Sequence, residues 1–185
     1  MLEGSITYNG GRIGIVVGRF NHDITDALLK GVMHGLEKYG VPGVDDADSS
    51  DEDGMVQIVR VPGAFEIPLT AQKLLRGELG KGACDIVITL GVIIKGDTDH
   101  YTYVCKECAD GIMQVSLQAN KPIVFEVLMV EDEKFARDRA VVPMDEHGEL
   151  ILDGPGASDW MKNKGYIAAL NALEMIDLYG KMDRG

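Results

Sequence analysis

The chain has 185 residues, of which 45% are hydrophobic, and this is enough apolar material for one substantial core. Its formal net charge of -12 argues against nucleic acid as a partner, because phosphate backbones are bound mainly by clustered lysine and arginine. The longest uncharged apolar run, residues 86–94, is too short to cross a bilayer, and the N-terminus shows no export signal. We therefore expect one cytoplasmic domain over residues 1–185, with no membrane or nucleic-acid partner.

Cysteines and acidic residues give two further expectations. Three cysteines, an odd number without disulfide-framework spacing, fit a reducing compartment. Cys105 and Cys108 form a C-x-x-C pair within a helical pattern, and we interpret them as buried small side chains rather than as a redox or metal site. Six acidic side chains crowd residues 45–53 without the spacing of a calcium-binding EF-hand loop. We interpret this segment as a solvated insert loop and predict no metal site.

The first half of the chain alternates short β-rich runs with helical patterns. Residues 12–17 are apolar and β-rich, and residues 24–36 then place apolar side chains on one helical face. Asn21 is the predicted cap of that helix and Gly40 its predicted end. Residues 55–61 repeat the strand pattern, and the Pro-Gly pair that follows turns the chain into a second helix.

The same alternation continues through the second half. Residues 84–94 form the most continuous apolar run and predict a central strand buried on both faces, after which the Gly96 turn opens a helix. Residues 122–130 predict the fourth strand. A short charged helix over residues 131–140 follows, and the spacing of apolar residues predicts a final helix from about Ser158.

Repeated strand and helix units predict a parallel sheet covered by helices on both faces, with ligands beyond the carboxyl ends of the strands. Residues 18–21, 61–66 and 93–100 each follow a strand and should converge there. Residues 141–160 are rich in proline and glycine and predict an extended loop, with a small hairpin as the alternative. Dinucleotide, P-loop and nucleophile-elbow motifs are absent, which argues against the simple forms of those sites.

His100 is the strongest candidate for a catalytic residue. It stands at a helix start after a buried strand, where backbone N–H groups favour anions, and an imidazole can move protons near neutral pH. These residues predict an anionic small-molecule site with proton-transfer chemistry. His22, His34 and His147 lie in polar or surface patterns, and we assign them no role.

Each of the other candidate site residues has two interpretations, one structural and one functional. Phe20, on a loop after a strand, either plugs the core or stacks on a planar ligand. Glu66 stands in an otherwise apolar segment and needs a cation or ligand hydroxyls as its partner, while Phe65 beside it favours packing. Arg137 and Arg139, on the short helix, either face solvent or meet a phosphate held by a neighbouring subunit.

Four segments together resemble the 6,7-dimethyl-8-ribityllumazine synthase family. They are Gly18-Arg19-Phe20-Asn21, Val61 to Pro68, Gly96 to Tyr101, and Asn163-Lys164-Gly165. The resemblance runs in order from about Arg12 to Leu178, interrupted by residues 45–53 and by an enlarged loop after Ala140. It implies an α/β fold, a flavodoxin-like three-layer α/β/α sandwich with a mainly parallel four-stranded sheet.

The resemblance also implies an activity. Family members condense 5-amino-6-ribitylaminouracil with 3,4-dihydroxy-2-butanone 4-phosphate in the penultimate step of riboflavin biosynthesis. They release phosphate and water and use no cofactor. Their active sites lie between adjacent subunits of a homopentamer. A non-catalytic homologue that binds flavin or lumazine is the alternative function, and a mainly structural shell subunit is a third.

The positions that match the family's site residues divide the candidate residues into two sets. The first set, on one subunit, contains the catalytic proton carrier and the groups that bind the ring, the ribityl chain and the phosphate: His100 with Phe20, Asn21, Ala64, Phe65, Glu66, Val92, Ile93, Ile94, Asp97 and Thr98. The second set, from the adjacent subunit, covers the ring and meets the phosphate: Phe125, Arg139 and Lys164. By this resemblance Phe20 stacks on the pyrimidine ring and Glu66 holds the ribityl chain, whereas Thr98 and Arg139 bind the phosphate.

The chain departs from the family pattern at several positions. Lys95 stands where arginine is usual, Glu126 where glycine is common, and Met129-Val130 replace a usual threonine pair. Residues 141–162 form a longer connection than in members that build sixty-subunit shells. We therefore predict a homopentamer.

Overall fold

One parallel sheet forms the centre of the protein. The computed structural model describes residues 1–44 and 55–184, so the predicted acidic insert at 45–53 lies outside the described residues. The sheet has the strand order β2-β1-β3-β4, and every pairing in it is parallel. The strands are β1 (Ile13–Gly18), β2 (Val56–Val61), β3 (Ile86–Ile94) and β4 (Ile123–Val130). The predicted mainly parallel four-stranded sheet is confirmed.

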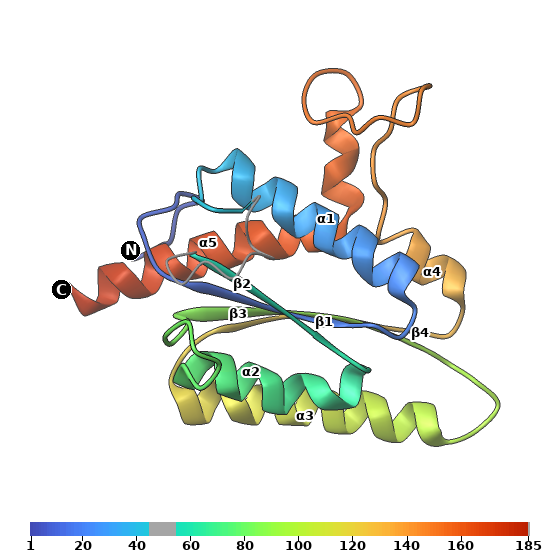
Figure 1. The fold of residues 1–185 in the computed structure, drawn as a ribbon, viewed down its shortest axis with the longest axis horizontal. Coiled ribbons are helices and arrows are strands. Elements are labelled where there is room, and N and C mark those ends of the chain that lie inside the picture. Colours follow the sequence, from blue (N-terminus) through green and yellow to red (C-terminus); the bar gives the residue numbers. More distant parts are fainter. Residues whose placement is uncertain (45–54, 185) are drawn as a thin grey trace.

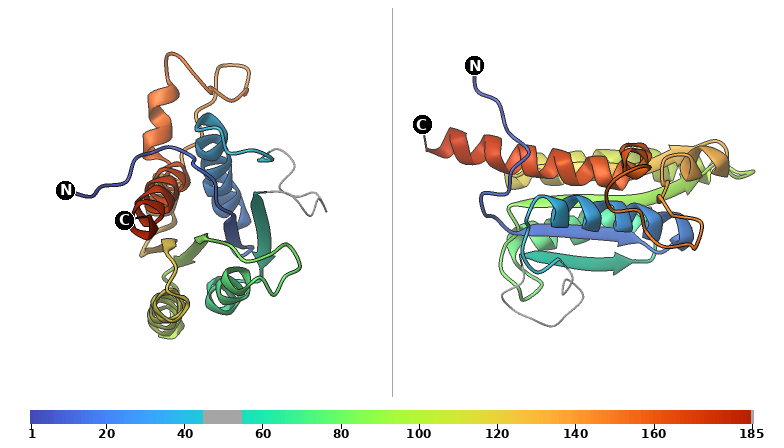
Figure 2. Two further views of the ribbon diagram at one scale, coloured as in Figure 1. Left: turned by 90° about the vertical axis from the view of Figure 1, so that its left-hand side faces the viewer. Right: turned by 90° about the horizontal axis from the view of Figure 1, so that it is seen from above.

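Helices cover both faces of the sheet. The α-helices are α1 (His22–Lys38), α2 (Ile67–Arg76), α3 (His100–Ala119), α4 (Glu133–Arg137) and α5 (Lys164–Asp183), and the 3-10 helices are η1 (Ala64–Glu66) and η2 (Ala157–Lys162). Figure 1 shows α1 and α5 on one face and α2 and α3 on the other, and the end-on view in Figure 2 separates the same layers. This is the predicted three-layer α/β/α sandwich. Within residues 1–44 and 55–184, no helix is long and apolar enough to span a membrane.

Alternation along the strands builds a separate core on each face. Ile15 and Val17 pack toward α1 and α5, whereas Val16 packs toward α2 and α3. The central strand β3 is buried along most of its length, as its continuous apolar run predicts. On α1, Leu28 and Val32 follow helical spacing and are fully buried.

Asn21 is the N-cap residue of α1, as predicted, but its side chain does not cap the helix. Asn21 has φ 58 and ψ 49, in the left-handed region, and its side chain makes no cap hydrogen bond. Its backbone carbonyl instead accepts from the N–H groups of Ile24 and Thr25, and its side-chain amide donates to the Val92 carbonyl at 3.3 Å. The left-handed turn therefore connects the start of α1 to the end of β3.

The last helix begins later than the predicted Ser158. Residues 157–162 form the 3-10 helix η2, and α5 begins at Lys164 after Asn163, which has extended backbone geometry. The extended loop before it contains one antiparallel bridge, between Met144 and Leu150, so the small-hairpin alternative is correct. Figure 1 shows this orange segment rising away from the α1 and α5 layer.

His34 is not in the surface setting that its sequence context indicates. Its side chain is only 8% exposed and lies against Trp160, with ring centroids 4.5 Å apart, and against Tyr166 at 5.6 Å. Trp160 also donates from Nε1 to the Ile151 carbonyl at 2.8 Å. Burial lowers the pKa of His34, with a smaller contribution from Lys38. The end of the long loop folds back on α1 and covers this histidine.

Candidate functional site

Loops after β1, β2 and β3 enclose a cleft of about 760 Å³ at the carboxyl ends of the strands. Its lining combines predicted and additional residues: Phe20, Pro62, Gly63, Ala64, Phe65, Glu66, Val92, Ile93, Ile94, Gly96, Thr98, His100, Tyr101, Tyr103 and Val104. The predicted convergence of the three post-strand segments is confirmed. Parallel strands end at the same edge of the sheet, which is why segments distant in sequence meet there.

Backbone hydrogen bonds hold the turn after β1 against the segment that ends β2 and follows it. Arg19 N–H donates to the Val61 carbonyl at 2.8 Å, and Phe20 N–H donates to the Pro62 carbonyl at 3.1 Å. The Phe20 ring is 73% exposed and the Phe65 ring 63% exposed, so neither packs in the core of this chain. The packing expectation for Phe65 is therefore wrong, and both rings offer apolar faces to the cleft.

The Glu66 carboxylate has a local partner. Its Oε2 atom accepts a hydrogen bond from the Gly63 N–H at 2.9 Å, at the start of η1. Glu66 is exposed and lines the cleft. This arrangement fixes the side chain while leaving a carboxylate that can accept from ligand hydroxyls.

The start of α3 combines a proton carrier with an anion-binding helix terminus. His100 is the first residue of this long helix and is exposed, and Thr98 lines the cleft just before it. The first N–H groups of an α-helix have no carbonyl partner within the helix, so they attract anions. Asp97 is exposed on the same loop but does not line the cleft.

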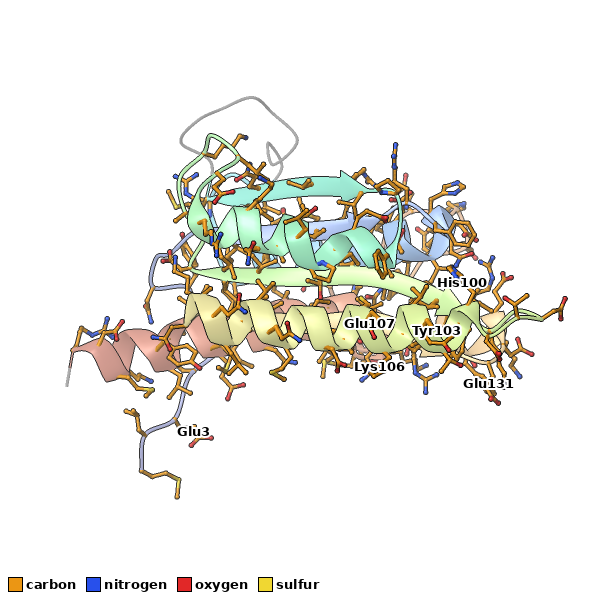
Figure 3. All side chains as sticks on the ribbon, turned by 90° about the horizontal axis from the view of Figure 1, so that it is seen from below. Glu3, His100, Tyr103, Lys106, Glu107 and Glu131 are labelled. Carbon is orange, nitrogen blue, oxygen red and sulfur yellow. The ribbon has the colours of Figure 1, made fainter. Side chains whose placement is uncertain are left out.

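Tyr103 is a further residue of the cleft that was not among the predicted ones. It is 66% exposed, lines the cleft and lies one turn after His100 on α3 (Figure 3). The spacing of three residues on a helix, which places side chains on the same face, is the signal that would have found it.

None of the second set of predicted residues lines this cleft. Phe125 is 41% exposed on β4, one of the two edge strands of the sheet. Arg139 and Lys164 are exposed, and they are joined by their backbones, because Lys164 N–H donates to the Arg139 carbonyl at 2.7 Å. The Arg139 guanidinium donates to the Phe135 carbonyl at 2.9 Å. Two cationic side chains thus start from adjoining backbone segments outside the cleft.

The model of one protein family, 6,7-dimethyl-8-ribityllumazine synthase, matches residues 10–180. The chain belongs to this family. Lumazine synthases are transferases, so this protein is an enzyme of riboflavin biosynthesis. Membership also implies small-molecule substrates and an oligomeric assembly.

Two departures from the usual lumazine synthase pattern have clear structural settings. Lys95 forms an ion pair with Glu131, with 2.9 Å between Nζ and Oε1, at the adjoining ends of β3 and β4. Glu126 is partly buried on β4, and burial raises its pKa to about 7, although nearby Lys164 lowers it. A carboxyl with this pKa changes its charge near neutral pH.

We expect Glu126→Gln to stabilise the protein at pH 8 and to change little at pH 5. The folded protein favours the protonated carboxyl up to about pH 7, whereas the ordinary value is 4.5. Wild-type stability therefore falls as the pH rises from about 4.5 to about 7, by ~1–3 kcal/mol for a partly exposed group. The glutamine variant does not ionise and avoids this loss. Urea unfolding followed by circular dichroism at both pH values, at fixed protein concentration, measures the difference.

Glu107→Gln is the matched control for this experiment. Glu107 is exposed on α3 and pairs with Lys106, so its replacement should change stability little at either pH. Equal pH dependence in wild type and Glu126→Gln would contradict the assignment of the titration to Glu126.

Proposed function

We propose that this protein condenses 5-amino-6-ribitylaminouracil with 3,4-dihydroxy-2-butanone 4-phosphate to form 6,7-dimethyl-8-ribityllumazine, the penultimate step of riboflavin biosynthesis. The main support is the cleft at the strand ends, where an exposed aromatic ring, a fixed carboxylate and a histidine beside a helix start lie together. They are Phe20, Glu66 and His100. Phe20 stacks on the pyrimidine ring and Glu66 accepts hydrogen bonds from the ribityl hydroxyls.

The chemistry needs proton transfer and stabilisation of a leaving phosphate. The 5-amino group attacks the ketone and loses water to give an imine. Loss of a proton and of the phosphate then gives an enol, which tautomerises to a carbonyl. The ribitylamino nitrogen attacks this carbonyl, and a second water leaves as the ring closes. His100 carries protons between these steps, since an imidazole exchanges them near neutral pH. The start of α3 and the Arg139 guanidinium offset the charge of the departing phosphate. The reaction draws its rate largely from holding two substrates in contact and needs no cofactor.

The proposal includes a homopentamer with active sites between adjacent subunits. Phe125, Arg139 and Lys164 do not line the cleft of their own chain, so they are available to complete the cleft of a neighbour. Large apolar side chains exposed on α2 and α3 give the α2 and α3 layer a reason to associate with another subunit: Leu69, Tyr103, Met113 and Leu117. The long connection over residues 141–162 favours a pentamer over a shell of sixty subunits.

A cytoplasmic location is also proposed. It is supported by the free thiols of Cys84, Cys105 and Cys108, because a reducing compartment keeps cysteines unpaired. Burial raises the pKa of Cys84 to about 11 and that of Cys108 to about 12, so both thiols stay protonated at neutral pH.

Turnover tests the proposed function directly. Purified protein mixed with both substrates should produce the absorbance and fluorescence of the lumazine well above the spontaneous background rate. His100→Ala should lower this rate by about 10²–10⁴-fold. Absence of product above background would contradict the proposal, and binding of product without turnover would favour the non-catalytic homologue. Sedimentation of a sixty-subunit particle would contradict the pentamer.

A further inference from the structure

Asn163 lies at a crossing point of three backbone segments. It is fully buried and precedes the first residue of α5. Its Nδ2 atom donates to the Ala27 carbonyl on α1 and to the Val141 carbonyl after α4, each at 2.9 Å. Its Oδ1 atom accepts from the N–H groups of Gly165, at 2.8 Å, and Tyr166, at 3.2 Å. All four hydrogen-bonding positions of this side-chain amide are therefore used.

The same residue lies beside the link between Arg139 and Lys164. The bond from Asn163 Nδ2 to the Val141 carbonyl is adjacent to the bond from Lys164 N–H to the Arg139 carbonyl. Asn163 and Lys164, which are consecutive, thus donate to the carbonyls of Val141 and Arg139, which are two residues apart. This pairing aligns the backbones from which both cationic side chains project.

Close packing of α1 against α5 makes the crossing possible. A Cβ atom at Gly165 would collide with the Leu28 carbonyl oxygen, and one at Gly31 would collide with Asn163 Oδ1. Only glycine at both positions lets the start of α5 approach the α1 backbone closely enough for Asn163 to reach Ala27. The position of Lys164 is consequently fixed by the sandwich itself rather than by the exposed loop.

Building on the proposed function, we propose that Asn163 is a positioning residue for the phosphate substrate, because it fixes the relative placement of Arg139 and Lys164. Asn163 itself is buried and does not meet the substrate. Its role differs from that of an ordinary helix cap. The cap needs only the Oδ1 acceptor, whereas positioning also needs the two Nδ2 donations.

Asn163→Ser separates these two functions. A serine hydroxyl keeps the capping acceptor at a good N-cap position but cannot make both donations to Val141 and Ala27. We expect the KM for the butanone phosphate to rise about tenfold, because small displacements of binding groups are costly, while the KM for the pyrimidine substrate changes less than about twofold. Inorganic phosphate, used as a competitive inhibitor, should lose affinity to a similar degree. If this variant does not fold, Asn163→Thr, whose hydroxyl also caps a helix and which fills more of the side-chain space, replaces it.

Leu173→Val is the matched structural control, since Leu173 is fully buried on the same helix but distant from the crossing. Both variants should lower Tm by a few degrees, and only Asn163→Ser should alter the KM for the phosphate substrate. Wild type without turnover would overturn the proposed function and this inference with it. The inference alone would be overturned if the wild type is active and Arg139→Ala raises the KM for the phosphate substrate, but Asn163→Ser leaves that KM unchanged.

Discussion

Arg139→Ala is expected to raise the KM for 3,4-dihydroxy-2-butanone 4-phosphate by about 10–100-fold while leaving the KM for the pyrimidine substrate nearly unchanged. In a chain with a net charge of -12, an anionic substrate depends on a few well-placed cations. No carboxylate within the described part of the chain pairs with the Arg139 guanidinium, whose contact is the Phe135 carbonyl. It therefore keeps donors for a phosphate. Steady-state kinetics with each substrate varied in turn measures the two KM values.

Arg137→Ala is the control for that measurement. Arg137 lies two residues earlier and forms ion pairs with Asp23 and Glu133, so its charge is already matched. Its loss should leave both KM values within about twofold of wild type. Arg139→Lys should fall between wild type and alanine, since lysine keeps the charge but not the planar two-donor geometry. Equal effects of the two alanine variants would contradict the specific role of Arg139.

Mixing two impaired variants should restore activity. His100→Ala damages the set that lines the cleft, and Arg139→Ala damages the set outside it. If each site combines the first set of one subunit with the second set of its neighbour, a mixed ring contains some sites that are intact in both halves. Random mixing at equal amounts makes about a quarter of the sites intact, so activity should recover to about a quarter of the wild-type value.

The experiment requires subunits to exchange, which is achieved by unfolding the mixture in urea and refolding it. Each variant carried alone through the same procedure should stay at its own low rate. Mixed assemblies no more active than the average of the two variants would show that each chain contains its whole site. That outcome would contradict the shared site without contradicting the activity.

Patterns that are local in the sequence were sufficient to predict the strands and the position of the cleft. Residues 86–94 are apolar without interruption because β3 is covered on both faces, and this signal does not depend on distant residues. The cleft followed from topology, because all parallel strands end at one edge. The sequence positions of Phe20, Glu66 and His100, each after a strand, therefore predict that they meet.

The errors depended on contacts between distant segments. His34 appears as a polar residue on a helix, and only the return of residues 157–163 onto α1 buries it against Trp160. Asparagine is a residue type typical of a helix N-cap, but the side-chain amide of Asn21 donates to the Val92 carbonyl on β3. Asn163 was recognised only as part of a motif. Its four hydrogen bonds join segments up to 136 positions apart, which no local pattern reports.

Trp160 is the only tryptophan in the chain, and it lies where the long loop rejoins the sandwich. Its indole is 2% exposed, lies tilted against His34 and donates to the Ile151 carbonyl. Emission from this single ring consequently reports on one place, the junction that leads into Asn163 and Lys164. The protein thus contains an intrinsic optical probe of the segment that leads into Lys164, and loosening of that segment can be followed without any added label.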